Sequence, residues 1–415
     1  MLSGAAVEAM RADLPSVTAR VYLNTGTFGP LPRATREAMR RHLDWATCSG
    51  RIGAEGLERW HRLEAEARSA LAAVLGCRSA DLALTHSTTD GVNTVLAGMT
   101  WQDGDEVVTG SVEHPGLTEP LAHLAESCGV IVRTVDITAG RAVQSVTAAL
   151  NARTRLVACS HVLWSTGEVL DLPGILAAAG EAGVPVLADG AQGAGAIAVD
   201  LTALGCDFYT VSGQKWLCGP SGTGALYVRS DRVADLAPPW RGYVTNDRSP
   251  GAPGTEPWPG ARRYDVGAIS LVALAGLSTS VQWRAEHGLA AGCDYAAALA
   301  GRLREGLAGV PGLDVDDPGG PTPFAAVTLP AAMDPEALVL DLEANGILIR
   351  SIPGPRPRLR ASVGPWNTDE DCIRLVGALN HTLPSRLKLA RSAEVDAFCR
   401  QRRAFESQAD RNHIH

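Results

Sequence analysis

A lysine and an aspartate 26 residues apart carry the clearest chemistry in this sequence. Lys215 lies in the run TVSGQKWLCGP, between an apolar segment and a glycine-rich turn. Poor solvation is expected to lower the pKa of its amine, leaving a free base that can attack a carbonyl. Asp189 ends the apolar run from Val184 to Ala188. A Schiff-base lysine and a carboxylate that can pair with a pyridinium nitrogen are the minimum set for pyridoxal phosphate (PLP) chemistry.

Several polar residues in the same part of the chain could hold such a cofactor. Thr88 and Thr89 open a predicted helix, where hydroxyls and free backbone N–H groups form an anion site. Ser212 and Gln214 flank the lysine and could donate to the same phosphate. Gln192 could hydrogen-bond the phenolic oxygen of the cofactor. Each feature alone is also explained by an ordinary helix cap or polar turn. The prediction of a cofactor site therefore rests on their occurrence together.

In five blocks the sequence resembles the class V aminotransferases, a PLP-dependent family of fold type I that includes the cysteine desulfurases. The resemblance runs from about Tyr22 to about Leu383, and the blocks occur in the order of the family. They are His86–Asn93, Glu113–Pro115, Ala188–Gly193, Thr210–Pro220 and Leu359–Thr368. The branch that the sequence resembles contains isopenicillin N epimerase and the C–S lyases of ergothioneine and lincosamide biosynthesis.

The resemblance implies roles for further residues. It makes His114 the ring that stacks on the cofactor and a catalytic residue together with Lys215 and Asp189. It also implies that Arg360 binds the α-carboxylate of the substrate, for which two parallel N–H donors are suited. The other residues expected at the substrate are Asn24, Thr25, Gly26 and Trp164. The nearby Arg350, Arg356 and Arg358 are expected to point to solvent or to the protein surface.

The sequence also departs from the family pattern at four places. Gln214 stands where the family has histidine, so a donor remains but a titrating group is lost. Ala268 replaces the threonine that reaches the phosphate of the neighbouring subunit, so only its N–H remains for cofactor binding. The loop Ser351–Pro357 contains no cysteine, which disfavours desulfurase activity. His161–Gly167 lacks the Asn-x-x-Gly pattern that many members have.

Short apolar runs alternate with helical patterns, which predicts an α/β fold: a large domain with a mostly parallel seven-stranded sheet and a smaller αβ C-terminal domain. The domain boundaries expected are an N-terminal segment 1–30 that reaches the site, a large domain 31–270, a connecting helix 271–290, a small domain 291–385 and a charged helical tail 386–415. Ligands of such sheets bind beyond the carboxyl ends of the strands.

Composition narrows the classes of function. The chain has 415 residues, 46% of them hydrophobic, and a net charge of −8, which gives no reason to expect nucleic acid as a partner. Nine scattered cysteines predict reduced thiols and neither a disulfide framework nor a metal site. No signal peptide or membrane span is recognised, so a cytoplasmic protein is expected. The resemblance further implies a homodimer with shared active sites.

The expected reaction occurs at the α-carbon of an amino acid. We favour C–S cleavage of an S-substituted cysteine in specialised metabolism, such as antibiotic biosynthesis, with a small-molecule cysteine conjugate as substrate. Five tryptophans in or beside the site blocks permit a broad aromatic pocket; they are Trp164, Trp216, Trp240, Trp258 and Trp366. Transamination, epimerisation and decarboxylation remain open. Two remote alternatives are a catalytically inactive PLP-fold binding protein and a nucleotide-binding oxidoreductase, whose Gly-x-Gly-x-x-Gly spacing is missing.

Overall fold

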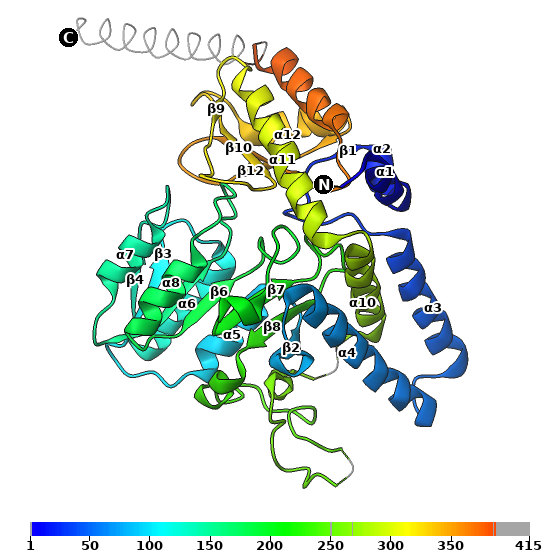
Figure 1. Cartoon of the computed structure of the whole chain (residues 1–415), viewed down its shortest axis with the longest axis vertical. Coiled ribbons are helices and arrows are strands. Elements are labelled where there is room, and N and C mark those ends of the chain that lie inside the picture. Colours follow the sequence, from blue (N-terminus) through cyan, green and yellow to red (C-terminus); the bar gives the residue numbers. More distant parts are fainter. Residues whose placement is uncertain (1, 250, 268, 385, 387–415) are drawn as a thin grey trace, which may run out of the picture.

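The structure is a computed structural model that describes residues 2–249, 251–267, 269–384 and 386. Its largest part is a seven-stranded sheet (Figure 1), with the order β2-β8-β7-β6-β5-β3-β4. The strands are β2 (Leu82–Thr85), β3 (Glu106–Gly110), β4 (Ile131–Val135), β5 (Thr154–Ser160), β6 (Val186–Asp189), β7 (Phe208–Ser212) and β8 (Gly224–Val228). Strand β8 runs antiparallel to both neighbours and the other pairs are parallel. The predicted fold class is confirmed.

Helices cover both faces of this sheet because its strands are apolar on both sides. On β5, Val157 and Cys159 pack into the core under one set of helices, whereas Leu156 and Ala158 pack under the other. The first set is α4 (Ala54–Leu75), α7 (Ala142–Ala149), α8 (Leu172–Glu181) and α10 (Leu271–Glu286). The second is α5 (Thr88–Gly98) and α6 (Pro115–Cys128). Burial on both faces holds the strand ends, and the residues that follow them, in fixed positions.

Local sequence explains where the two helices nearest the site begin. The Ser87 side chain caps α5 by accepting from the Asp90 N–H, 3.1 Å away. Helix α6 has proline at its first position, which needs no N–H donor there, and His114 as its cap. Both helices therefore begin directly after strands β2 and β3, with their N-termini at the edge of the sheet where the predicted site residues lie.

A second, smaller core lies above the sheet in Figure 1. It surrounds an antiparallel sheet with the order β12-β13-β10-β9. Its elements are β9 (Asp314–Val315), β10 (Phe324–Thr328), β12 (Arg350–Ile352), β13 (Arg358–Ser362), α11 (Leu289–Ala308), α12 (Pro335–Ala344) and a helix over 369–384. Here β11 (Ile347–Leu348) pairs with β1 (Val21–Tyr22) instead of continuing into β12.

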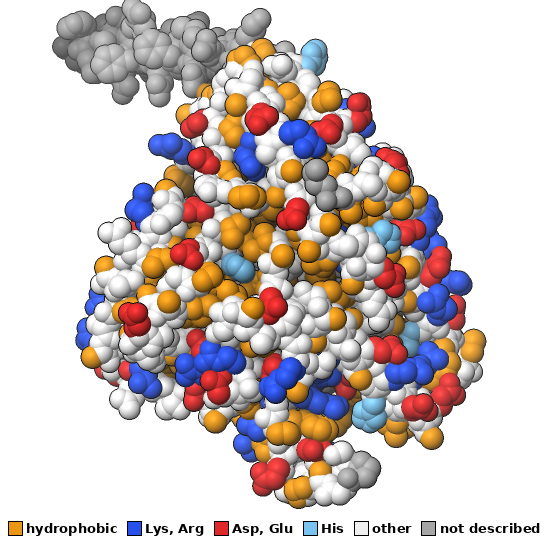
Figure 2. Space-filling view, in the orientation of Figure 1, with side chains coloured by type: hydrophobic (Ala, Val, Ile, Leu, Met, Phe, Trp, Pro, Cys, Tyr) orange, Lys and Arg blue, Asp and Glu red, His pale blue; other side chains and the backbone are white. Residues whose placement is uncertain are grey.

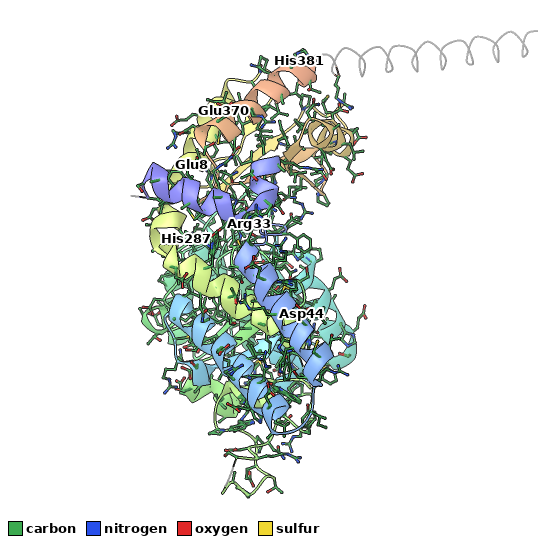
Figure 3. All side chains as sticks on the ribbon, turned by 90° about the vertical axis from the view of Figure 1, so that its right-hand side faces the viewer. Glu8, Arg33, Asp44, His287, Glu370 and His381 are labelled. Carbon is green, nitrogen blue, oxygen red and sulfur yellow. The ribbon has the colours of Figure 1, made fainter. Side chains whose placement is uncertain are left out.

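The N-terminal segment packs onto this smaller lobe. Helix α1 (Gly4–Asp13) lies beside the start of the 369–384 helix, as the positions of Glu8 and Glu370 show (Figure 3). Arg11 joins them, with its Nη1 2.9 Å from Asp371 Oδ2. These contacts support the predicted grouping of residues 1–30 with the C-terminal domain, although the exact boundaries stay predictions. Of the predicted tail 386–415, all but residue 386 lies outside the described residues.

The remaining elements connect these parts. They are α2 (Pro15–Ala19), α3 (Arg33–Ser49), α9 (Leu201–Leu204) and the short 3-10 turns η1 (Ser79–Asp81), η2 (Ser230–Asp235) and η3 (Ala261–Tyr264). On the face shown in Figure 2, positive and negative side chains are interspersed, and apolar side chains gather below the smaller lobe. Within the described part of the chain, no helix is both long and apolar enough to cross a membrane.

Candidate active site

The carboxyl ends of five strands bring the predicted site residues to one edge of the large sheet. Thr88 follows β2, His114 follows β3, Trp164 follows β5, Asp189 ends β6 and Lys215 follows β7. The sequence separates these residues by up to 127 positions, and only the strand order places them together. This is the edge at which open α/β sheets bind ligands.

Lys215 is partly buried, and its amine has a low pKa for a lysine. Burial lowers the pKa to about 8; the negative charge of Asp189 raises it, and the charges of Arg360 and Arg350 lower it further. Within the described residues, the Lys215 amine has no hydrogen-bond partner. Backbone contacts fix the residue: a side chain at Gly29 would come within 2.0 Å of the Lys215 carbonyl oxygen. The structure therefore presents a largely desolvated amine on a rigid backbone.

Asp189 is buried with one of its oxygens free. The Ala191 N–H donates to Asp189 Oδ1 at 2.9 Å, and the Thr210 hydroxyl lies 3.4 Å from the same oxygen. Both contacts leave Asp189 Oδ2 for another donor. A protonated pyridine nitrogen is a donor of that kind.

The amide of Gln192 is oriented by two partners that cannot exchange roles. Its Oε1 accepts from the Trp216 indole N–H at 2.8 Å, and its Nε2 donates to the Gly26 carbonyl at 2.8 Å. Because an indole N–H can only donate, the amide cannot be reversed. One Nε2 hydrogen remains, which suits an acceptor such as a phenolic oxygen.

His114 has a defined tautomer. Its Nδ1 accepts from the Gly116 N–H at 2.9 Å, so the neutral ring carries its proton on Nε2. Burial, followed by the positive charge of Lys215, lowers the pKa of His114 and favours this neutral form. The ring meets the edge of Trp164, with centroids 5.2 Å apart and planes at 90°. His114 and Trp164 thus form one aromatic corner of the site.

The predicted phosphate residues lie around the start of α5 and the end of β7. Thr88 and Thr89 occupy the first turn of α5, and Ser212 is buried at the end of β7. Gln214 has a buried side-chain oxygen without a hydrogen-bond partner among the described residues. A helix N-terminus and a buried hydroxyl fit an anionic group. The unpaired Gln214 atom is an acceptor, so Gln214 would have to present its amide NH2 to that group. This set therefore fits the phosphate of PLP.

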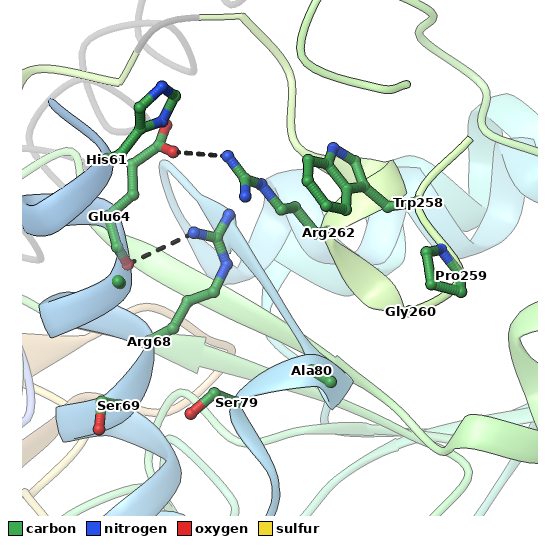
Figure 4. A pocket seen from close by; sticks show the side chains of 11 residues that line it. His61, Glu64, Arg68, Ser69, Ser79, Ala80, Trp258, Pro259, Gly260 and Arg262 are labelled. Atoms are coloured by element: carbon green, nitrogen blue, oxygen red, sulfur yellow. Dashed lines mark hydrogen bonds and ion pairs between the residues drawn. The ribbon is translucent and has the colours of Figure 1, made fainter. Parts of the chain in front are cut away.

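Ala268 lies outside the described residues. The preceding segment is anchored to the sheet, because the Leu84 N–H donates to Asp265 Oδ1 at 2.9 Å and Arg68 pairs with the same carboxylate. Beside this anchor lies a cavity of about 450 Å³ (Figure 4), where the Arg262 guanidinium covers the Trp258 ring. Apart from Trp258, which was expected in an aromatic substrate pocket, none of the residues predicted for the active site lines this cavity.

Arg360 and the N-terminal strip form the side of the site opposite the sheet. Arg360 is completely buried on β13 and donates to the Trp164 carbonyl, while its Nε has no acceptor in the described structure. Gly26 lies next to it: a Cβ there would be 3.1 Å from both Arg360 Nη2 and Gln192 Oε1. Asn24 pairs with Ser362 at the end of β13, and Thr25 is buried between them. The structure thus brings the predicted substrate residues together.

Arg350 also faces the site, and the expectation that it points to solvent is wrong. In β12 it lies opposite Arg360, its Cζ is 5.8 Å from the Trp164 ring centroid, and its Nη1 is 3.4 Å from Thr27 Oγ1. Arg358, by contrast, pairs with Asp316. Arg350 and Thr27 are therefore the site residues that sequence reasoning missed. The two-residue spacing of Arg350 and Ile352 puts both on one face of a strand, but only the pairing of β12 with β13 places Arg350 beside Arg360.

Cys218, three residues after the lysine, is a packing residue. It is completely buried, and burial raises the pKa of its thiol to about 12, so the thiolate is not formed at neutral pH. Among the described residues, no group of three or more His, Cys, Asp or Glu side chains could hold a metal ion. The chemistry available in the site is thus that of Lys215, Asp189, His114 and the arginines.

Comparison with known proteins decides the family. Residues 21–375 match the family described as aminotransferase class V. The chain belongs to the class V aminotransferase family. It is 32% identical to a cysteine desulfurase of Enterobacter sp. (strain 638), over 75% of this chain and 80% of the relative. It is 31% identical to the isopenicillin N epimerase of Amycolatopsis lactamdurans, over 88% and 95%.

Solved structures agree with this class V assignment. The cystine C–S lyase C-DES, in complex with its product cysteine persulfide, superposes with a TM-score of 0.83 at 28% identity, covering 88% of this chain and 99% of that one. A C-DES mutant with glycine covalently linked to the PLP cofactor gives 0.84 at 27% identity, covering 89% and 98%. This class V chain is a PLP-dependent enzyme, as predicted, and the buried donors around Lys215 fit that cofactor.

Proposed function

We propose that this PLP enzyme cleaves the Cβ–S bond of an S-substituted cysteine by β-elimination. The observation that supports the proposal most directly is that, among the described residues, no reactive thiol lies at the site for sulfur transfer. The loop Ser351–Pro357 contains no cysteine, and Cys218 is buried with a raised pKa. Without a cysteine to receive sulfur from the substrate, sulfur leaves as a free thiol. A likeness to the cystine C–S lyase C-DES is consistent with this outcome.

PLP, when bound, supplies an electron sink for negative charge at the α-carbon of the substrate. Lys215 would hold the cofactor and then remove the α-proton with its amine, whose lowered pKa of about 8 leaves a useful free-base fraction at neutral pH. Asp189 would keep a proton on the pyridine nitrogen through its free Oδ2. Gln192 would donate its remaining amide hydrogen to the phenolic oxygen. Thr88, Thr89, Ser212 and Gln214 would bind the phosphate.

Arg360 would orient the substrate from the side of the site opposite the sheet, and His114 would stack on the cofactor. Arg360 has unused donor capacity at Nε and its charge has no carboxylate partner in the described structure, so it suits the α-carboxylate. His114 would hold the aromatic face of the site, with its Nε2–H directed by the Gly116 contact. Asn24, Thr25, Gly26 and Trp164 would complete the substrate pocket. Orientation by these groups favours breakage of the Cα–H bond.

Epimerisation is the second candidate, because isopenicillin N epimerase matches over 88% of the chain. The product assay separates the two. Holoenzyme with an S-alkyl-L-cysteine should release thiol, pyruvate and ammonia in equal amounts. Conversion to the D-isomer without thiol would instead establish epimerisation, and consumption of an added keto acid would establish transamination. Alanine together with enzyme-bound sulfur from free cysteine would contradict the proposal and indicate a desulfurase.

The assembly and setting are also proposals. We propose a homodimer because the resemblance implies active sites shared between subunits. A cytoplasmic setting and a role in specialised metabolism are proposed as well, the latter from the likeness to isopenicillin N epimerase. Sedimentation at micromolar concentration should give twice the 43.4 kDa mass of the chain. An active species sedimenting at the mass of one chain would contradict the dimer.

A further inference from the structure

Two arginines bring positive charge to one side of the site. Arg350 and Arg360 are opposite residues of neighbouring antiparallel strands, so their side chains share one face of the sheet. The Thr27 hydroxyl oxygen lies 3.4 Å from Arg350 Nη1 and 3.5 Å from Arg360 Nη2. Both guanidinium groups therefore approach a single oxygen atom.

This pair of charges is unbalanced. In the part of the chain that the structure describes, no carboxylate lies within 4.0 Å of either guanidinium, whereas Arg358 on the same strand pairs with Asp316. Burial lowers the pKa of Arg350, and burial together with the charge of Arg350 lowers the pKa of Arg360 to about 9. Two desolvated like charges destabilise the empty site, so its ligand should supply more than one negative charge.

Arg350 retains donors for such a ligand. Its Nε donates to the Ser351 carbonyl at 3.1 Å and its Nη1 contacts Thr27. A guanidinium group has five N–H hydrogens, so some of them remain free for a ligand. Trp164 lies under the Arg350 guanidinium and also lines a cavity of about 470 Å³ together with Ile352. A substituent that extends along Trp164 from the reacting centre would thus pass Arg350 and have space beyond it.

We propose that Arg350 is a specificity residue that binds a second carboxylate, on the S-substituent of the substrate, while Arg360 binds the α-carboxylate. The inference rests on the proposed C–S cleavage and narrows its substrate class to cysteines whose S-substituent carries a carboxylate. In the reaction the Cα–H and Cβ–S bonds break, the sulfur leaves with a proton as a carboxylated thiol, and water replaces the amine to give pyruvate and ammonia.

The test compares two substrates of nearly equal size. S-carboxymethyl-cysteine and S-carbamoylmethyl-cysteine differ by one negative charge. We expect kcat/KM of the holoenzyme to be at least about tenfold higher for the carboxylate. Arg350→Gln should remove this preference mainly through KM, and Arg350→Lys should restore part of it. Arg302→Gln is the matched control: this exposed arginine is paired with Asp369 and does not line the cavity beside Trp164, so the ratio between the two substrates should persist.

A binding measurement separates failure of this inference from failure of the proposed reaction. By calorimetry, glutarate should bind the holoenzyme more tightly than butyrate, and Arg350→Gln should remove that difference. If glutarate shows this dependence but neither cysteine derivative releases thiol, the proposed reaction is wrong and the anion site stands. If both derivatives are cleaved equally, or Arg350→Gln weakens both by the same factor, Arg350 does not read a second carboxylate and the inference is wrong.

Discussion

Gln192 and Arg360 approach the same glycine from opposite sides of the site, yet their hydrogen bonding differs. Gln192 Oε1 and Nε2 are both engaged by protein partners at 2.8 Å. Arg360 is more deeply buried but leaves Nε unpaired. The sheet side of the site (Asp189, Gln192 and His114) is held in one orientation without a ligand. The lobe side (Arg350 and Arg360) instead keeps unpaired donors and uncompensated charge.

This difference matches two kinds of ligand. A cofactor that stays bound benefits from donors and acceptors whose orientation the protein has already fixed, because little order is lost on binding. A substrate carboxylate that comes and goes must supply the partner that the arginines lack, so its binding energy is concentrated on the lobe side. Changes on the sheet side should therefore affect the chemistry itself, and changes on the lobe side should act mainly on substrate selection.

The largest effect is expected from Lys215→Ala, which removes both the attachment point and the base. Turnover should fall by about 10⁴-fold or more, with the fold retained by circular dichroism. The sequence contains one other lysine, Lys388, so Lys388→Ala is a matched control that should keep full activity. An active Lys215→Ala enzyme would show that this side of the site is not catalytic.

Asp189→Asn should rank second. The variant keeps an oxygen for the Ala191 N–H but loses the negative charge that supports a protonated ring nitrogen. We expect kcat to fall by roughly 10²–10³-fold, while the cofactor still binds. If KM rose and kcat were unchanged, Asp189 would be acting on substrate binding, and the contrast between the two sides would fail.

Arg360→Ala tests substrate binding on the lobe side of the site. Loss of a buried charged donor should cost about 2–4 kcal/mol in kcat/KM, with the visible absorbance of the bound cofactor unchanged. Arg302→Ala, which removes an exposed arginine paired with Asp369, is the control and should behave as wild type. If the variant lost cofactor binding as well as substrate binding, Arg360 would not act on the substrate alone, and the proposed division between the two sides of the site would be wrong.

The pH dependence of kcat should report the amine of Lys215, which is free only after the substrate has taken its place on the cofactor. A lowered pKa of about 8 means that the protonated, inactive form dominates below pH 8, so activity should fall with decreasing pH. The lowered pKa of Lys215 also makes the stability of the cofactor-free protein depend on pH. The unfolded lysine holds its proton to a higher pH, so the free energy of unfolding should rise between about pH 8 and 10.5. Lys215→Met should abolish that rise in denaturant titrations.

The smallest effect is expected from Trp216→Phe. It removes the donor that fixes Gln192 Oε1 while keeping an aromatic ring in the core. Loss of one hydrogen bond costs about 1 kcal/mol, so the cofactor Kd should rise by about fivefold. A Kd equal to that of the wild type would mean that the orientation of Gln192 does not contribute to cofactor binding.

Sequence reasoning predicted the sheet side better than the lobe side, for a physical reason. Buried strands produce apolar runs, so the runs Leu82–Thr85 and Glu106–Gly110 mark β2 and β3 with the bounds observed, and the residues after each run lie at the expected edge. The lobe side depends on which strands pair and in what register. Local patterns do not show that β11 leaves the sheet to join β1, or that Arg350 faces Arg360. The unpaired charge of Arg350 and Arg360 could therefore be recognised only from the three-dimensional structure.

The most direct test of the whole account is to reduce the purified holoenzyme with borohydride and identify the labelled residue by mass spectrometry. Reduction makes the bond between PLP and its lysine permanent, so we expect the mass of the cofactor on the peptide that contains Lys215. A cofactor mass on Lys388, or no labelled lysine in protein supplied with PLP, would contradict the central role of Lys215 and the site built around it.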